Sequence, residues 1–191
     1  MKKTILRIFS GVVLVAALYF SAIGIQQYVF GNIHAVVEGE LYRSAQLTPQ
    51  QMAEVARDHG IKSVINLRGD NTGSSWYDNE VAASKALGIT HIDFRIKSSR
   101  ELTDAQVSDL IAAMKDAPKP ALIHCHAGAD RTGLAAAIYV AAIAKRGEEA
   151  AEDQLSMRYG HLTEFPFWWT KAQAMSRTFE RLEPVFGFHG S

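Results

Sequence analysis

A ten-residue stretch of the chain brings together the side chains that an attack on a phosphate group needs. It reads His124-Cys125-His126-Ala127-Gly128-Ala129-Asp130-Arg131-Thr132-Gly133. A cysteine thiolate is a strong nucleophile, and the planar guanidinium of an arginine can hold two phosphate oxygens at once. Because Arg131 follows Cys125 by six residues, it can reach back over a tight loop toward the sulfur. The pattern indicates in-line attack by Cys125 on a bound phosphate monoester.

The segments on either side of this stretch can build a cradle for an anion. The short apolar run 121–124 is typical of a buried strand, and apolar residues return at helical density over 133–144. A loop between a strand and a helix N-terminus gathers inward-facing N–H groups at the positive end of the helix dipole. That field favours the thiolate of Cys125, and the Thr132 hydroxyl can donate to the sulfur. The residues predicted to surround the phosphate are His126, Ala127, Gly128, Ala129, Asp130, Arg131 and Thr132.

Two other interpretations of this stretch are weaker. A lone cysteine at a strand end is often an inert small hydrophobic residue, but here an arginine, a glycine and a Thr-Gly pair accompany it. His124 and His126 could suggest a metal site, yet residues two apart point to opposite faces of a strand and no further ligand cluster is visible. We therefore expect no metal and no other cofactor. Since Cys125 is the single cysteine, an intramolecular disulfide is excluded.

Beyond residue 30, the chain alternates predicted strands and helices. Thr48-Pro49-Gln50-Gln51 and the segment Thr103 to Gln106 each have the pattern of a capping box at the start of a helix. Strands are predicted within 35–44, 61–67, 89–96 and 121–124, and helices over 48–59, 77–87, 103–115, 133–144, 148–159 and 168–183. This alternation predicts an α/β fold built on a layered sheet, with residues 31–191 forming one domain.

Residues 1–30 form a separate segment of different composition. Lys2, Lys3 and Arg7 are its only charged residues, and the uncharged apolar stretch from Ile8 to Ile25 has 18 residues. As a helix, that stretch spans roughly 27 Å, close to the hydrocarbon thickness of a membrane. It predicts a single-pass anchor. The preceding cations would leave the N-terminus in the cytoplasm and place the domain on the periplasmic side of a bacterial inner membrane.

A cleaved signal peptide is the alternative for this segment. It shares the cationic start and the apolar run, and its cleavage would release the domain into the periplasm. Ala22-Ile23-Gly24 is a poor match to the small-x-small cleavage pattern. The sequence therefore favours an anchor.

The charge balance argues against a nucleic-acid partner. In the whole chain 20 Lys and Arg residues oppose 20 Asp and Glu residues, and beyond residue 30 the numbers are 17 and 20. A slightly acidic domain offers no basic surface for a phosphate backbone.

The stretch around Cys125 resembles the signature H-C-x5-R-[ST] of the cysteine-based protein tyrosine phosphatases, specifically the compact dual-specificity type. The segments Leu41-Tyr42-Arg43-Ser44-Ala45-Gln46 and Ile65-Asn66-Leu67-Arg68 are similar to an opening and a central strand of bacterial and fungal members. The resemblance covers roughly residues 35–185. It implies a central mixed sheet with helices on both faces and a phosphocysteine intermediate formed without metal. Cys125 would be the nucleophile, Arg131 would stabilise the transition state, and the amides of residues 126–131 would form the cradle.

The resemblance does not identify which residue is the general acid. Family members usually carry an aspartate on a separate upstream loop, but the corresponding segment Lys97-Ser98-Ser99-Arg100 has no acidic residue. Asp130, inside the phosphate loop, stands where myotubularin-like and Sac-type lipid phosphatases have an aspartate with a proposed acid role. Asp130 is therefore the first candidate, Asp93 the second and Glu101 the third.

The predicted activity is hydrolysis of phosphate monoesters, with phosphotyrosine in protein as the first substrate class. A phospholipid or lipopolysaccharide phosphate is the alternative, favoured by the anchor and by Asp130. A pseudophosphatase that only binds phosphoproteins is a further alternative. Such a protein would be expected to lack Cys125 or Arg131, and both are present.

Four other residues are predicted to be structural. Trp168 and Trp169 suit packing in the core or at a membrane interface. Arg43 and Arg68 suit ion pairs or the rim of the pocket.

Overall fold

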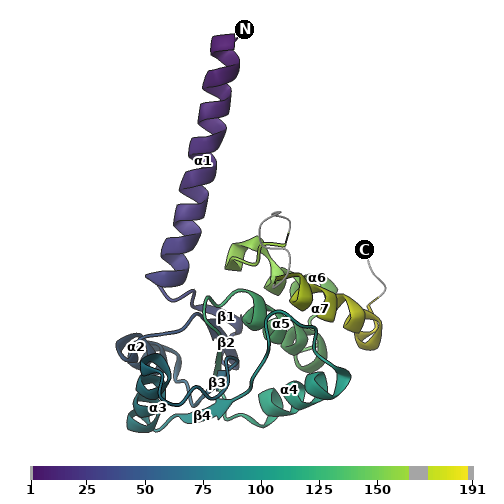
Figure 1. Cartoon of the computed structure of the whole chain (residues 1–191). Coiled ribbons are helices and arrows are strands. Elements are labelled where there is room, and N and C mark those ends of the chain that lie inside the picture. The colour runs from purple at the N-terminus through teal and green to yellow at the C-terminus, as the bar shows by residue number, and fades with distance from the viewer. Residues whose placement is uncertain (1, 164–171, 189–191) are drawn as a thin grey trace.

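The computed structural model describes residues 2–163 and 172–188, which comprise a long N-terminal helix and an α/β domain (Figure 1). Trp168, Trp169 and the predicted start of the last helix lie outside these residues. The elements are α1 (Lys2–Tyr28), β1 (His34–Val37), β2 (Leu41–Ser44), α2 (Pro49–His59), β3 (Ser63–Asn66), α3 (Ser75–Leu87), β4 (Thr90–Asp93), α4 (Asp104–Asp116), β5 (Ala121–His124), α5 (Asp130–Ile138), α6 (Glu148–Glu152) and α7 (Ala172–Phe186).

The strands form one mixed sheet in the order β1-β2-β5-β3-β4. The β1–β2 pair is antiparallel, and the other pairs are parallel. The predicted α/β class with a mixed sheet is therefore confirmed. Strand β5 lies in the middle, with Ser44 of β2 and Asn66 of β3 on either side of His124. Three parallel strands thus end together where the loop containing Cys125 begins.

Both faces of the sheet are covered by helices (Figure 1). On β5, Ala121 and Ile123 belong to the core shared with α4, α5 and α7, whereas Leu122 packs in the cluster that includes residues of α2. Successive side chains of a strand point to opposite faces, so a central strand with two covered faces must be apolar throughout. This explains why the run before His124 carries no charge.

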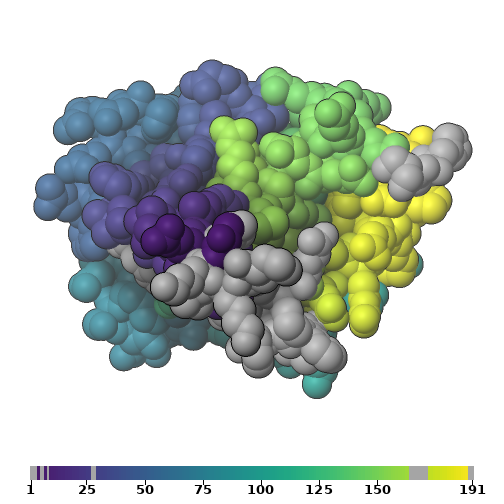
Figure 2. Space-filling model, turned by 90° about the horizontal axis from the view of Figure 1, so that it is seen from above, coloured from purple at the N-terminus to yellow at the C-terminus, as the bar shows by residue number. Residues whose placement is uncertain are grey.

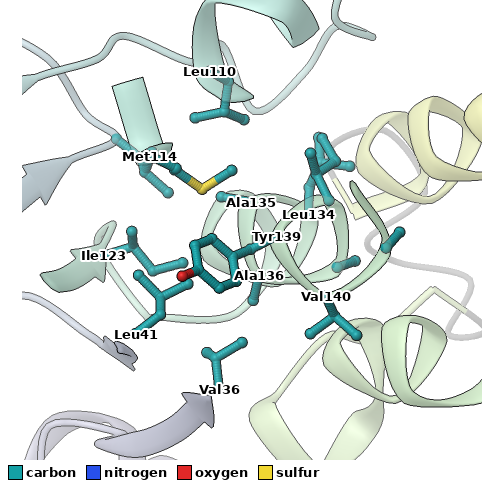
Figure 3. Close-up of a cluster of buried hydrophobic side chains, with 14 of the residues drawn as sticks. Val36, Leu41, Leu110, Met114, Ile123, Leu134, Ala135, Ala136, Tyr139 and Val140 are labelled. Atoms are coloured by element: carbon teal, nitrogen blue, oxygen red, sulfur yellow. The ribbon is translucent and has the colours of Figure 1, made fainter. Parts of the chain in front are cut away.

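Helix α5 lies at the centre of the domain. Its residues from Leu134 to Ile138 are all 0 % exposed. Figure 3 shows this helix among Leu110 and Met114 of α4 and Ile123 of β5. The small alanine side chains of α5 allow the surrounding elements to approach closely on every side. The first turn of α5, which follows the phosphate loop, is therefore held in place by packing.

Local signals located several helix ends correctly. Thr48 and Thr103 both form the predicted capping boxes, with Gln51 and Gln106 at the third helical position. Gly60 ends α2 in the left-handed conformation that glycine adopts without strain.

Three predicted elements need correction. Residues 35–44 form a hairpin, β1 and β2, rather than one extended stretch, and the predicted helix 133–144 starts at Asp130 and becomes π-helical over Tyr139–Ile143. The predicted helix 148–159 ends at Glu152 and continues as short 3-10 turns. It breaks because the Gln154 carbonyl turns toward the buried Arg43, from which it accepts a hydrogen bond of 2.8 Å.

Candidate active site

The predicted nucleophile lies at the carboxyl end of β5, just before the first turn of α5. Cys125 is a free cysteine with 3 % of its surface exposed. Residues 126–129 form the loop, and Asp130 is the first residue of α5. Its sequence neighbours place the sulfur between a central strand and the positive end of a helix, as the sequence predicted.

Three successive carbonyl groups of the loop are held by donors outside it. The His126 carbonyl accepts from the Gln46 N–H (3.1 Å), the Ala127 carbonyl from Asn32 Nδ2 (3.0 Å), and the Gly128 carbonyl from Arg43 Nη2 (2.9 Å). A planar trans peptide points its N–H away from its C=O. The N–H groups of the following residues therefore turn away from these donors, toward the interior of the loop, where an anion can accept from them.

Gly128 is required by the backbone path of the loop. Its φ of +70° lies in the left-handed region, and an added Cβ would lie 2.7 Å from Ser44 and Ala45 backbone atoms. The loop thus packs directly on the chain that follows β2. A side chain at this position would push it away.

Arg43 fixes the loop from within the protein, which corrects the prediction of an ion pair or a rim residue. Its side chain is fully buried, donating through Nη1 to the Gln154 carbonyl and through Nη2 to the Gly128 carbonyl. Burial lowers the pKa of Arg43 to about 10, which leaves the guanidinium charged at neutral pH. The sequence did carry a signal, namely a single charged residue within a short strand.

We predict that Arg43→Lys both destabilises the domain and weakens phosphate binding. A lysine cannot bond the Gln154 and Gly128 carbonyls together, and each buried carbonyl left without a donor costs about 1–3 kcal/mol. Because at least one of the two carbonyls loses its donor, urea unfolding should show a loss of roughly 1–3 kcal/mol, and the inhibition constant of vanadate should rise. Arg57→Lys is the matched control, since the Arg57 side chain is 72 % exposed. Equal stability of the two variants would contradict this role of Arg43.

Arg131 lies near two other basic residues, His126 and Arg68. Within the described ranges, its guanidinium has no hydrogen-bond partner, so it is available to an anion. Burial and the nearby charges of Arg68 and Arg131 lower the pKa of His126. Burial also lowers the pKa of Arg68, which is close enough to both Arg131 and Cys125 to sense their charges. Arg68 thus lies at the site, as the prediction of a rim position allowed.

A buried carboxylate that the sequence analysis missed lies beneath the loop. Glu80 of α3, with a fully buried side chain, accepts hydrogen bonds from His124 Nε2 (3.1 Å), His91 Nε2 (2.9 Å) and Gln46 Nε2. Burial alone would raise the pKa of Glu80, but the charge of His124 and the three hydrogen bonds lower it to about 2. The carboxylate therefore fixes the side chain of the residue preceding Cys125. The sequence did hold a signal for Glu80, namely its helical spacing from Tyr77 and Ser84, with which it shares the buried face of α3.

Asp130, the first candidate for the general acid, is oriented by a buried histidine. His161 Nδ1 donates to Asp130 Oδ1 (2.7 Å), and His161 Nε2 is hydrogen-bonded to Ser176 Oγ of α7 (2.9 Å). The Asp130 side chain is 32 % exposed, whereas that of His161 is 1 % exposed. One carboxyl oxygen is thus held while the carboxyl group stays accessible. No local pattern in the sequence marked His161.

The other two acid candidates have different surroundings. Asp93 ends β4, and its oxygens accept from Asn66 Nδ2 (2.9 Å) and from the Tyr77 hydroxyl (2.5 Å). The bond to Asp93 raises the pKa of Tyr77 well above its usual value. Asp93 therefore ties β4 to β3 and α3, and strands β3 and β5 separate it from β2, which carries Arg43. Glu101 is exposed, in the segment between β4 and α4.

The Thr132 hydroxyl is buried and has no hydrogen-bond partner in the part of the chain that the structure describes. The predicted bond to the Cys125 sulfur is therefore not formed in this structure. A buried hydroxyl without a partner is free to donate to a group that enters the site.

A protein-family model described as "Swiss Army Knife protein, DSP-PTPase phosphatase domain" matches residues 32–174. The chain belongs to this family. It is thus a cysteine-dependent phosphatase of the protein tyrosine phosphatase type, as the sequence resemblance implied. The match begins at Asn32, the residue whose side chain holds the Ala127 carbonyl.

Solved structures share the fold of this DSP-PTPase domain. TpbA of P. aeruginosa is 23% identical, with 82% of this chain and 91% of that chain covered at a TM-score of 0.60. The core catalytic domain of the PP-IP phosphatase SIW14 of S. cerevisiae is 18% identical, with 82% of this chain and 93% of that chain covered at a TM-score of 0.58. A putative phosphatase of Shewanella putrefaciens is 18% identical, with 86% of this chain and 99% of that chain covered at a TM-score of 0.60. A search of curated proteins finds no match.

Proposed function

We propose that Cys125, Arg131 and Asp130 carry out a two-step hydrolysis of phosphate monoesters. The Cys125 thiolate attacks phosphorus, the bond from phosphorus to the leaving oxygen breaks, and Asp130 gives that oxygen a proton. A water molecule then attacks the phosphocysteine and passes a proton to Asp130. The S–P bond breaks, releasing inorganic phosphate and restoring the thiolate.

The observation that carries this proposal is the outward anchoring of the loop carbonyls at His126, Ala127 and Gly128. It directs the amides of the following residues inward, where they can bind the equatorial oxygens of a phosphate. Arg131 supplies a bidentate guanidinium to the same oxygens as charge builds up in the transition state.

Asp130 is the acid that the geometry favours. His161 holds one carboxyl oxygen, which sets the direction of the other. Both oxygens of Asp93 serve structural hydrogen bonds, so a proton donor there would have to break them. A structural neighbour, a TpbA variant solved in complex with pTyr, supports phosphotyrosine as one substrate class, and a phosphate on a lipid is the alternative.

Hydrolysis of p-nitrophenyl phosphate by the full-length protein tests the mechanism. We expect activity to persist in excess EDTA and to be blocked by vanadate, because a thiolate and a guanidinium supply the nucleophile and the charge. Loss of the activity on chelation, with recovery on adding back a divalent metal, would replace the cysteine mechanism by a metal-dependent one.

We further propose that residues 1–30 anchor a phosphatase domain, residues 31–191, on the periplasmic side of a bacterial inner membrane. The described part of α1 contains one window, Phe9–Gln26, with a mean hydropathy of 1.8 and no residue buried in the protein. A signal sequence passes the same test of length and composition. The poor cleavage pattern and the contacts of the end of α1 with the domain support an anchor.

A periplasm-specific reporter fused after Ser191 should be active, and the fusion should stay in the membrane fraction after alkaline washing. A soluble mature protein whose first residue lies near Gln26 would show that the segment is a cleaved signal peptide.

A further inference from the structure

One residue connects the end of helix α1 to the phosphate loop. The Asn32 N–H donates to the Gln26 carbonyl (2.8 Å), within the last turns of α1. The Asn32 side-chain amide donates to the carbonyls of Ala127 (3.0 Å) and Tyr159 (3.0 Å). Asn32 is 1 % exposed and has a φ of 47°, a conformation that asparagine tolerates better than most residues. The loop is thus attached directly to the base of α1.

This connection sets the depth of the catalytic loop relative to a membrane around α1. The apolar window ends at Gln26, which would lie at the boundary of the hydrocarbon. The headgroup layer beyond that boundary is roughly 5–8 Å thick on each side of a bilayer. Because Asn32 touches both Gln26 and Ala127, the phosphate loop would lie at the level of the lipid headgroups.

The surroundings of this connection suit a lipid. Val29 and Phe30 are 58 % and 67 % exposed at the base of α1. An open, mainly apolar groove of about 520 Å³ lies beside them, lined by Ala22, Ile25, Gln26, Phe30 and Ile33. Apolar groups near the hydrocarbon boundary can contact acyl chains.

A cation lies on the same side of the domain. Arg158 is exposed, and its guanidinium carbon lies 5.4 Å from the ring centre of Tyr159, whose carbonyl accepts from Asn32. Figure 2 looks down on this face, with the purple helix α1 toward the viewer and the green segment near residue 159 beside it. A guanidinium at this level can attract anionic headgroups.

From this geometry we infer that the substrate is a phosphate monoester on a lipid headgroup, in the leaflet at which α1 ends. This inference rests on the proposed catalytic site and anchor, and it names the substrate class of that site. Cys125 would form the S–P bond as the bond from phosphorus to the lipid oxygen breaks. The lipid alcohol would leave with a proton from Asp130 and stay in the membrane, while water releases phosphate from Cys125.

The experiment uses the full-length protein in phosphatidylcholine vesicles that contain 5 mol% long-chain phosphatidic acid as the probe. One variant carries four Glu-Ala-Ala-Ala-Lys repeats between Phe30 and Gly31, a semi-rigid spacer of roughly 30 Å that leaves Asn32 in the domain. The matched control carries a Gly/Ser insert of the same length at the same point, which lets the domain return to the surface. For all three proteins we measure hydrolysis of phosphatidic acid, of p-nitrophenyl phosphate and of a phosphotyrosine peptide. The peptide is supplied either in solution or attached to a lipid in the vesicle.

We expect the helical spacer to lower phosphatidic acid hydrolysis by about tenfold or more, the flexible insert to lower it less, and neither to change p-nitrophenyl phosphate hydrolysis. Equal phosphatidic acid rates in all three proteins would overturn the inference. So would cleavage of the membrane-attached peptide without cleavage of phosphatidic acid, because the substrate would then be a protein. Absence of p-nitrophenyl phosphate hydrolysis in every protein would instead contradict the proposed catalytic site.

Discussion

Replacing Cys125 by serine is expected to lower the rate of phosphate monoester hydrolysis by roughly 10⁴- to 10⁶-fold. A serine hydroxyl stays protonated at neutral pH and is a far weaker nucleophile than a thiolate. The amides that form the cradle are backbone groups, and their carbonyl anchors do not involve the sulfur. Phosphate binding, measured by calorimetry, should therefore survive in Cys125→Ser, whose unfolding curve should match that of the parent protein.

Arg131→Lys serves as the contrasting variant for this prediction. A lysine presents a point charge and cannot grip two oxygens, so both turnover and phosphate affinity should fall. A Cys125→Ser protein that keeps a substantial part of its activity would show that another group attacks phosphorus. A Cys125→Ser protein that loses phosphate binding would show that the sulfur helps to build the cradle.

Replacing Asp130 by asparagine is expected to slow hydrolysis of an alkyl phosphate by about 10²- to 10⁴-fold and that of p-nitrophenyl phosphate much less. An alkoxide is a poor leaving group and needs a proton, whereas nitrophenolate leaves without one. The basic limb of the pH profile of kcat/KM should also disappear, because it reports ionisation of the acid. Vanadate affinity should change little, since an acid acts on the leaving oxygen rather than on the equatorial ones.

Asp93→Asn is the matched control, with the same chemical change at another acid candidate. Asp93→Asn should keep the parent protein's ratio of rates on the two substrates and its pH profile, and it should lose stability, since Asp93 bonds Asn66 and Tyr77. His161→Asn should reproduce part of the Asp130→Asn pattern, because the carboxyl group would lose its orientation. Equal damage to both substrates in Asp130→Asn, or the leaving-group pattern in Asp93→Asn alone, would assign the acid elsewhere.

The sequence by itself determined the features that depend on neighbours along the chain. The signature around Cys125 occupies nine consecutive residues, and the strand and helix beside it follow from local patterns. The capping boxes at Thr48 and Thr103 involve residues only three positions apart, so spacing alone identifies them. The apolar character of α1 likewise needs no tertiary contact to be recognised.

The tertiary structure decided how the loop is held and how its acid is aimed. Arg43 and Asn32 bind loop carbonyls that lie 85 and 95 positions away in the sequence. His161 binds Asp130, which lies 31 positions away. No spacing rule relates residues so far apart, because their encounter depends on the order of the strands in the sheet and on the packing around α5. The same contacts brought the end of α1 against the phosphate loop. Local patterns thus specified the chemistry, and long-range packing set the geometry and the membrane depth at which we propose that it operates.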